Sequence, residues 1–179
     1  HAESVLLQVY ASVLDGGTPL VVTDLPTAEL VKVSANAFLA TKISFINAIA
    51  EICEMTGADV VKLADAIGHD PRIGRSFLDA GLGFGGGCLP KDVRAFIARA
   101  GEIGAGQSLL FLHEVDAINL RRRERVAEIA AELVGGTLIG RKVAVLGVAF
   151  KPHSDDVRDS PALNVAGRLQ LQGAHVAVY

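Results

Sequence analysis

The sequence contains few of the residues on which disulfide-rich and secreted proteins depend. Its 179 residues include two cysteines, one methionine and no tryptophan, and aromatic residues make up 5% of the chain. Two cysteines cannot form the disulfide framework of a secreted domain, so a reducing environment is indicated. We find no signal-peptide pattern and no uninterrupted apolar run of membrane-spanning length. These absences predict a cytoplasmic protein that does not bind a membrane.

Excess charge is also absent. The chain has 17 basic and 20 acidic residues, for a net charge of −3, and half of its residues are hydrophobic. This balance supports a substantial core and argues against disorder. The basic residues form no stripe suited to nucleic acid, and histidine and cysteine show no metal-ligand spacing. We therefore expect neither a nucleic-acid partner nor a metal site.

The hydrophobic periodicity predicts three regions. Residues 1–26 combine a helix over residues 3–14 with a short strand over 20–23, as at the end of an α/β domain. Residues 27–135 are helical. Residues 136–179 combine a strand over 142–150, a helix that begins after Ser160-Pro161 and a strand over 175–179, which is a βαβ unit. The predicted fold is a mainly α central domain with a long buried dimerisation helix, flanked by partial α/β Rossmann-like domains.

The central region begins with an unusually long helix over residues 27–55, which would extend roughly 45 Å. Apolar residues occupy nearly every face of it, so we expect it to be buried all round at the centre of a homodimer. Two polar residues, Lys32 and Asn36, lie one turn apart. A buried lysine is costly unless an anion meets it. The alternative is that the Lys32 side chain reaches solvent from the helix end.

The most distinctive stretch is Gly83-Phe-Gly-Gly-Gly-Cys88-Leu-Pro90-Lys-Asp92. Four glycines in five residues predict a loop whose bare backbone lies close to a ligand. Pro90 suits the first turn of a helix, which places Cys88 where the helix dipole favours an anion. A thiol there should ionise more easily, and the thiolate is the nucleophile. The simpler alternative is a glycine turn with Cys88 as a small buried residue.

Two further features have structural explanations. Cys53 lies among apolar residues of the long helix and is expected to contribute packing only. A second long helix, over about residues 108–133, carries the run Arg121-Arg-Arg-Glu-Arg125. We expect this run to form a solvated helical face.

Four stretches together resemble the UDP-glucose/GDP-mannose dehydrogenase family. They are Leu30-Val-Lys-Val-Ser-Ala-Asn-Ala-Phe-Leu-Ala40, Asp70-Pro-Arg-Ile-Gly74, the glycine-cysteine stretch above, and Phe150-Lys151 followed by Asp155-Asp-Val-Arg-Asp-Ser160. The cysteine motif also occurs in the GDP-mannose branch. The Asp-Pro-Arg-Ile-Gly segment is more similar to the UDP-glucose branch.

The resemblance implies an enzyme that oxidises the C6 alcohol of UDP-glucose to a carboxylate in two steps, giving UDP-glucuronate and reducing NAD. It implies a fragment that contains the tail of an NAD-binding Rossmann domain, the helical middle and the start of a UDP-binding domain. The dinucleotide fingerprint and further catalytic residues would lie outside these residues. We therefore expect this chain to be inactive by itself.

The resemblance also implies roles for individual residues. Cys88 would attack the aldehyde-level intermediate, with Lys32, Asn36 and Asp92 as the other catalytic residues. Lys91 and Arg158 would approach the NAD pyrophosphate. The UDP-sugar would contact Lys32, Asn36, Arg72, Phe77, Asp79, Ala80, Gly81, Leu82, Gly83, Phe84, Gly85, Phe150 and Lys151, with Arg72 reaching the substrate of the neighbouring subunit.

Two alternatives remain open at the level of the sequence. The first is a sibling enzyme that acts on GDP-mannose or another UDP-sugar. The second is a non-catalytic dimerisation module, in which the glycine loop and the long helix serve structure only. The reactivity of Cys88 relative to Cys53 distinguishes a catalytic cysteine from a structural one.

Overall fold

A computed structural model describes residues 2–179. The chain folds as two compact units that divide between Lys32 and Val33, within one long helix. In the first unit, α1 (Ala2–Val9) and α2 (Ala11–Asp15) form two helices where the sequence predicts one, with a break at Tyr10. Their apolar side chains line a hollow of about 580 Å³ with residues up to Ala28.

The strand predicted over residues 20–23 is absent. Residues 18–24 belong to neither helix nor strand, and Val21 is 80% exposed. A strand is defined by its hydrogen-bonded neighbour, and no described residue pairs with this segment as a strand does. The prediction is therefore wrong for the chain as described.

Helix α3 (Leu25–Thr56) confirms the long helix and its position. The carboxylate of Asp24 accepts a hydrogen bond of 2.8 Å from the backbone N–H of Thr27, which caps the first turn. This bond is the main cause of the lowered pKa of Asp24.

The burial of α3 differs from the expectation. Only one side of the helix is buried within the chain. The buried residues of α3 are mainly small, such as Ala37, Ala40 and Ser44. On the opposite side Phe38, Phe45 and Ile52 repeat every seven residues and are each about half exposed or more. The periodicity failed to separate the two sides because apolar residues occupy both.

By length and composition, α3 is also the one helix of residues 2–179 that is able to cross a membrane. Its buried side nevertheless carries hydrogen-bonded polar groups. The Ser44 hydroxyl donates to the carbonyl of Val115 at 2.7 Å, and Asn47 accepts from the N–H of Gly81 at 2.9 Å. A helix that packs against protein through polar groups passes the same composition test without spanning a bilayer.

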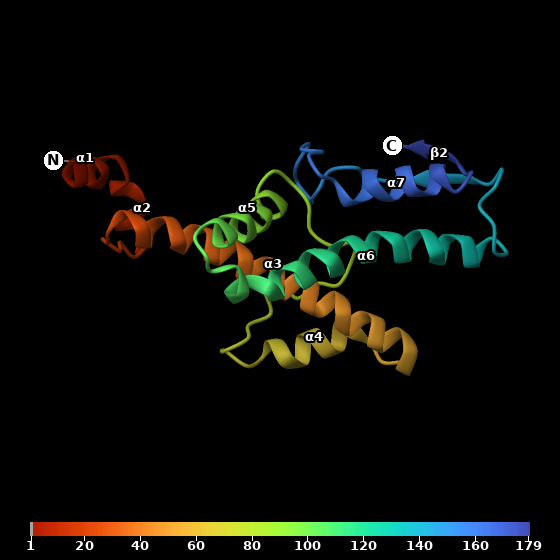
Figure 1. The fold of residues 1–179 in the computed structure, drawn as a ribbon, viewed down its shortest axis with the longest axis horizontal. Coiled ribbons are helices and arrows are strands. Elements are labelled where there is room, and N and C mark those ends of the chain that lie inside the picture. The colour runs from red at the N-terminus through yellow and green to blue at the C-terminus, as the bar shows by residue number, and fades with distance from the viewer. Residues whose placement is uncertain (1) are drawn as a thin grey trace. The chain divides into compact units, whose positions relative to one another are not determined.

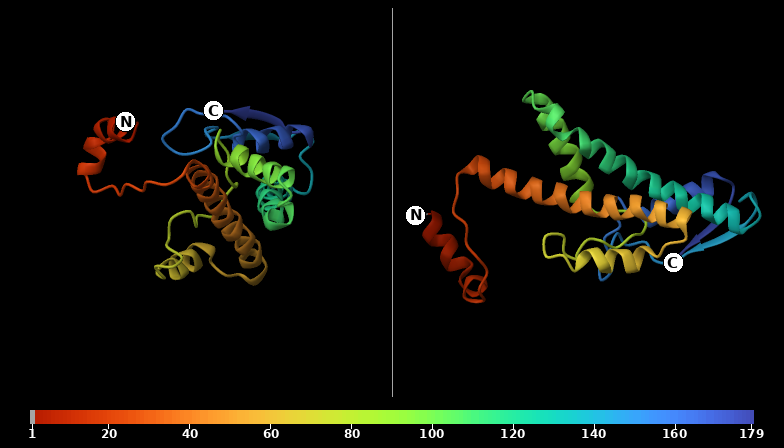
Figure 2. Two further views of the ribbon diagram at one scale, coloured as in Figure 1. Left: turned by 60° about the vertical axis from the view of Figure 1, so that its left-hand side comes forward. Right: turned by 90° about the horizontal axis from the view of Figure 1, so that it is seen from below.

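Helix α4 (Val60–Gly68) and Leu78 cover part of the buried side of α3. Helix α4 follows a tight turn and is capped by Asp59, whose carboxylate accepts from the N–H groups of Val61 and Lys62. Ile46 of α3 packs with Ala64 of α4 and with Leu78. Figures 1 and 2 show α4 beside the C-terminal half of α3.

The remaining helices of the central region are α5 (Leu89–Glu102), the short 3-10 helix η1 (Gly106–Leu109) and α6 (Leu110–Leu133). Their shared core with α3 consists of Ala37, Ala40, Phe84, Val93, Leu112 and Val115. The glycine loop enters this core through Phe84, which is 4% exposed. The loop is therefore anchored at its centre by an aromatic side chain.

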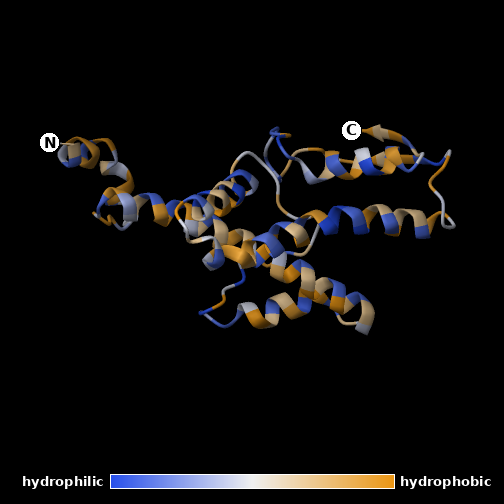
Figure 3. Ribbon diagram, in the orientation of Figure 1, coloured by the Kyte–Doolittle hydropathy of each residue, from blue (hydrophilic) through white to orange (hydrophobic). Residues whose placement is uncertain are grey.

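The arginine run on α6 is not the solvated face that the sequence suggested. It forms a hydrophilic band in the middle of α6 (Figure 3), yet Arg122 is 8% and Arg123 only 1% exposed. Charged side chains of this kind are rarely buried unless they have partners. The two arginines therefore have partners that the linear pattern does not reveal.

The C-terminal region forms the predicted βαβ unit. Strands β1 (Lys142–Val145) and β2 (His175–Val178) are parallel, with Lys142 opposite His175, and α7 (Pro161–Leu171) connects them. Ser160 caps α7 through the N–H of Leu163. Strand β1 ends five residues earlier than predicted, and residues 146–150 enter the loop before α7. The unit packs on α6 through Ala127, Leu138, Val165, Leu169 and Ala174.

Candidate functional site

Cys88 lies at the junction between the glycine loop and α5, as predicted. It occupies the N-cap position of that helix, its side chain makes no capping hydrogen bond, and it is exposed. Its carbonyl accepts a hydrogen bond of 2.8 Å from the N–H of Asp92, the first intrahelical bond. The thiol is therefore accessible at the end of the helix where the dipole favours an anion.

Asn36 and Asp92 meet although they are 56 residues apart. The side-chain amide of Asn36, on α3, donates to the carboxylate of Asp92, on α5, at 2.6 Å. Lys91 lies beside the other carboxylate oxygen, with Nζ 3.5 Å from Oδ1. Lys32 precedes Asn36 by one turn in α3 and belongs to the first unit. The packing of α5 against α3 thus brings together two of the predicted catalytic residues one turn from Cys88.

The glycine loop lies close to other protein atoms at four of its glycines. A Cβ added at Gly83 would meet the side chain of Asn119, and one at Gly85 would meet the carbonyl of Asp159. At Gly86 a Cβ would lie 2.6 Å from the ring of Phe150, and at Gly87 it would lie 2.8 Å from the guanidinium carbon of Arg158. Gly85, Gly86 and Gly87 thus lie directly against the segment before α7, and Gly83 lies against α6, so none of them has room for a side chain.

Phe150, Lys151 and Arg158 therefore come to the cysteine loop from the C-terminal region. The N–H of Gly86 donates to the carbonyl of Arg158 at 2.9 Å, which joins the two loops through their backbones. Lys151 Nζ lies 5.4 Å from the centroid of the Phe150 ring. Three residues predicted to contact substrate or cofactor are thus assembled around the loop that ends in Cys88.

Arg158 is oriented by Asp156, two residues away. Its Nε and Nη2 atoms donate to the Asp156 carboxylate at 3.0 and 2.6 Å. The Arg158 guanidinium lowers the pKa of Asp156 to about 2. The pKa of Arg158 is raised, chiefly by the hydrogen bond to Asp156 and to a smaller extent by Cys88. A fixed positive charge therefore lies near the thiol.

Two buried polar residues of α6 were missed by the sequence analysis. The Asn119 amide pairs with the backbone of Phe84: Oδ1 accepts from its N–H at 2.7 Å and Nδ2 donates to its carbonyl at 3.1 Å. Arg123, one turn later, donates to the same carbonyl at 2.8 Å. The signal that was available is the four-residue spacing, which places both side chains on one face of the helix.

The segment after α4 contributes a second group of predicted substrate residues. Arg72 is exposed and donates to the Asp70 carboxylate at 2.6 Å, which lowers the pKa of Asp70 and raises that of Arg72. Phe77 adopts a left-handed backbone with φ of 65°, which is uncommon for a bulky residue. Asp79 pairs with Arg75 at 2.8 Å. These contacts are local to the loop, which presents the Arg72 side chain outward.

Neither a nucleotide fingerprint nor a metal site emerges from the described residues. Gly81, Gly83 and Gly86 match the spacing Gly-x-Gly-x-x-Gly, but they follow the loop after α4, whereas the dinucleotide fingerprint follows a strand. Within residues 2–179 no group of three or more histidine, cysteine, aspartate or glutamate side chains gathers as metal ligands do.

The candidate site thus combines an exposed cysteine at a helix start, an asparagine–aspartate pair and a βαβ unit that is hydrogen-bonded to the cysteine loop. Residues 26–121 match the model of the UDP-glucose/GDP-mannose dehydrogenase family, central domain, and residues 144–179 match its UDP binding domain. The chain belongs to the UDP-glucose/GDP-mannose dehydrogenase family.

Individual relatives agree with the family. The chain is 49% identical to the UDP-glucose 6-dehydrogenase TuaD of Bacillus subtilis over 90% of its length, and 44% identical to the UDP-glucose 6-dehydrogenase of Rhizobium meliloti over its whole length. It covers 34% and 40% of those proteins.

Solved structures give the same picture. The UDP-glucose dehydrogenase of the archaeon Pyrobaculum islandicum superposes on 99% of the chain with a TM-score of 0.88 and 43% identity, and the chain covers 40% of it. The UDP-D-ManNAc dehydrogenase of Pyrococcus horikoshii matches 88% of the chain, and the chain covers 37% of it, with a TM-score of 0.75 and 30% identity. The chain thus spans well under half the length of the relatives it matches.

The close packing of the glycine loop predicts that alanine substitution will change the free energy of unfolding to different extents at two glycines. Gly85→Ala should destabilise the protein by about 1–3 kcal/mol, because its Cβ would overlap the backbone of Asp159. Gly81→Ala should change stability by less than about 0.5 kcal/mol, because nothing lies within 4 Å of its Cβ position. Urea unfolding of both variants measures the difference. Equal effects would contradict the packing described.

The exposure and position of Cys88 predict selective alkylation. Iodoacetamide at neutral pH should modify Cys88 well before Cys53, which is 4% exposed within α3. Peptide mapping by mass spectrometry gives both rates in one sample. The same measurement in urea gives the rate of each cysteine in the unfolded chain, without burial or local electrostatics. If Cys88 reacts faster in the folded protein than in urea, the local electrostatics activate it. A rate at or below that of Cys53 would identify Cys88 as structural.

Proposed function

We propose that the protein containing this chain is an NAD-dependent UDP-glucose 6-dehydrogenase, which oxidises UDP-glucose to UDP-glucuronate. The observation that carries the proposal is the exposed Cys88 at the start of α5, one turn from the hydrogen-bonded Asn36–Asp92 pair. The family membership and the names of the most similar relatives support this substrate over other nucleotide sugars.

Cys88 acts on the aldehyde that the first oxidation of C6 produces. The thiolate sulfur forms a bond to C6, and the carbonyl electron pair moves onto oxygen, giving a thiohemiacetal. The exposed thiol has the access that this step needs. A thiolate suits it because it is both a strong nucleophile and an adequate leaving group.

Lys32 and Asn36 stabilise the negative charge that develops on that oxygen. A positioned donor of this kind contributes about 3 kcal/mol to the transition state. The Asn36 amide is held in place by its 2.6 Å bond to Asp92, which leaves its second amide hydrogen available to a ligand. Lys32 lies one turn before Asn36 on the same face of α3. Removing either donor is expected to slow the reaction more than it weakens binding.

Hydrolysis releases the product after the second oxidation has converted the thiohemiacetal to a thioester. Water adds to the thioester carbonyl, and the C–S bond breaks with its electron pair returning to Cys88. Asp92, one turn from Cys88, accepts the proton of the attacking water. The Asp92 carboxylate accepts a hydrogen bond from Asn36 and lies beside Lys91, and these contacts hold it in place for this step.

NAD accepts a hydride in each oxidation when it is bound. Two cations of this chain fit its pyrophosphate. The Arg158 guanidinium packs where a Cβ of Gly87 would be, and Lys91 lies in the first turn of α5. Both are largely exposed. They would supplement a dinucleotide-binding domain.

The UDP-sugar lies against the segment Asp79–Gly85, which includes Ala80, and against the nearby Phe77, and it lies under Phe150 and Lys151. The ring of Phe150 covers Gly86, and Lys151 adds a positive charge suited to a diphosphate. Arg72 projects outward and reaches the substrate of a second subunit. We further propose that the domains of this chain span residues 1–26, 27–135 and 136–179, and that the protein is cytoplasmic.

The homodimer forms through the exposed side of α3. Phe38, Phe45 and Ile52 repeat every seven residues, the spacing that helices use to pack along their length. Large apolar side chains exposed in one line mark an interaction surface. These three residues belong to the same helix as Asn36, so dimerisation through them would also stabilise the catalytic region.

The first test of the proposal is turnover. The full-length protein should reduce two NAD per UDP-glucose, measured as absorbance at 340 nm, with GDP-mannose and UDP-N-acetylmannosamine as competing substrates. Cys88→Ser should abolish acid formation, because a hydroxyl is a poor nucleophile at neutral pH. Residues 1–179 alone should give no NADH. Preferred oxidation of GDP-mannose would assign the sibling activity, and no oxidation of any sugar would favour the dimerisation module.

Adjacent residues of α3 provide a matched test of the dimer. Phe45→Asp should produce a folded monomer, because Phe45 is 49% exposed. Ile46→Asp should unfold the protein, because Ile46 is fully buried against Ala64 and Leu78. Light scattering and circular dichroism separate these outcomes. Val61→Asp, at a residue that is 59% exposed on α4 and so lies outside the Phe38–Phe45–Ile52 line, is the control. A wild-type monomer would contradict the proposed interface.

A further inference from the structure

The carbonyl of Phe84 is the centre of a buried polar cluster that the proposed reaction does not use. It accepts two hydrogen bonds, from Asn119 Nδ2 at 3.1 Å and from Arg123 Nη2 at 2.8 Å. Asn119 is fully buried, Arg123 is 1% exposed and Phe84 is 4% exposed. A buried guanidinium is costly to desolvate, so its hydrogen bonds must compensate.

Arg123 also reaches the segment that precedes α7. Its Nη1 atom lies 3.2 Å from Asp159 Oδ1, so one guanidinium binds the glycine loop with one nitrogen and the C-terminal region with the other. Asp159 has a left-handed backbone, with φ of 45°, and its carbonyl lies against Gly85. The backbone carbonyl of the preceding residue, Arg158, accepts from the N–H of Gly86. The contact between the two loops therefore depends on how Asp159 is held.

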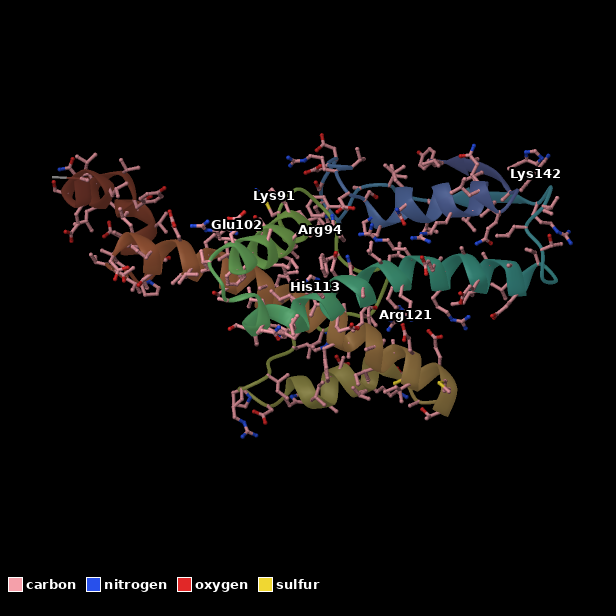
Figure 4. The ribbon with its side chains drawn as sticks, viewed as in Figure 1. Lys91, Arg94, Glu102, His113, Arg121 and Lys142 are labelled. Carbon is pink, nitrogen blue, oxygen red and sulfur yellow. The ribbon has the colours of Figure 1, made fainter. Side chains whose placement is uncertain are left out.

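The cluster continues to the helix that Cys88 begins. Arg94 of α5 has Nη1 3.8 Å from the second oxygen of Asp159, and its Nε donates to Asp116 of α6 at 3.1 Å. Figure 4 labels Arg94 on α5, close to the loop that precedes α7. Asp159 is thus bound by arginines from both helices that frame the site.

We propose that Arg123 is a positioning residue that fixes the cysteine loop relative to the UDP-binding unit, and thereby aligns Cys88 with the sugar. It does so by holding the Phe84 carbonyl and the Asp159 carboxylate at the same time. For its effect on the reaction this inference rests on the proposed function. An arginine is required because its two terminal nitrogens diverge in a rigid plane, whereas lysine presents a single point charge.

The test uses the full-length protein with Arg123→Met, Arg123→Lys and the control Arg121→Met. Arg121 lies on the same helix and pairs at the surface with Glu51. Arg123→Met should lower kcat/KM about 100-fold, since small misplacements of reacting groups have effects of that order. The loss should appear in kcat as well as in KM for the UDP-sugar. Arg123→Lys, which keeps the charge and one donor, should recover part of it, and Arg121→Met should stay within about twofold.

Amide hydrogen exchange supplies a readout that needs no turnover. In Arg123→Met the peptide over residues 83–88 should exchange at least about tenfold faster, because the Gly86 N–H bond to Arg158 loosens, while peptides of α4 stay unchanged. If the wild-type protein oxidises no UDP-sugar, the proposed function fails and exchange alone decides the positioning role. Wild-type kcat/KM and exchange in Arg123→Met would overturn the inference. Should that variant not fold, wild-type values in Arg123→Lys would overturn it, and intermediate values would support it.

Discussion

The backbone of Phe84 is the point on which the arrangement of the site depends. Its N–H and carbonyl are both bound by side chains of α6, and its ring lies in the core that α3, α5 and α6 share. Buried backbone groups are rarely left without partners. In a regular element a neighbouring strand or turn would bind them. Here an asparagine and an arginine replace that strand, which lets an irregular glycine-rich loop cross the interior.

The loop has to be irregular because the segment before α7 lies so close to it. Successive glycines face Asn119, Asp159, Phe150 and Arg158, and a side chain at these positions would overlap them. This proximity brings an aromatic ring and two cations of the C-terminal region to within reach of Cys88. The glycines are therefore a consequence of the close contact between the cysteine loop and the segment before α7, which brings the βαβ region next to Cys88.

The two sides of α3 differ in burial and in the size of their residues. Small residues such as Ala37 and Ala40 allow α5 and α6 to approach closely, and Ser44 and Asn47 satisfy backbone groups of neighbouring segments. The larger Phe38, Phe45 and Ile52 remain outside the chain's own core. A helix that is apolar on all sides thus supports the core on one side and leaves large apolar side chains exposed on the other.

The sequence by itself determined those features that depend on local physics. The position of α3, the cap Ser160, the position of Cys88 at a helix start and the βαβ unit follow from periodicity, capping and proline placement. Only the tertiary structure decided what meets across the chain. Residues 20–23 form no strand without a partner, Arg123 is buried because Phe84 and Asp159 converge on it, and Asn36 meets Asp92 only when α5 packs on α3. Each of these depends on partners 36 or more residues away, or on a partner strand that the described chain does not supply. Local periodicity carries no information about such contacts.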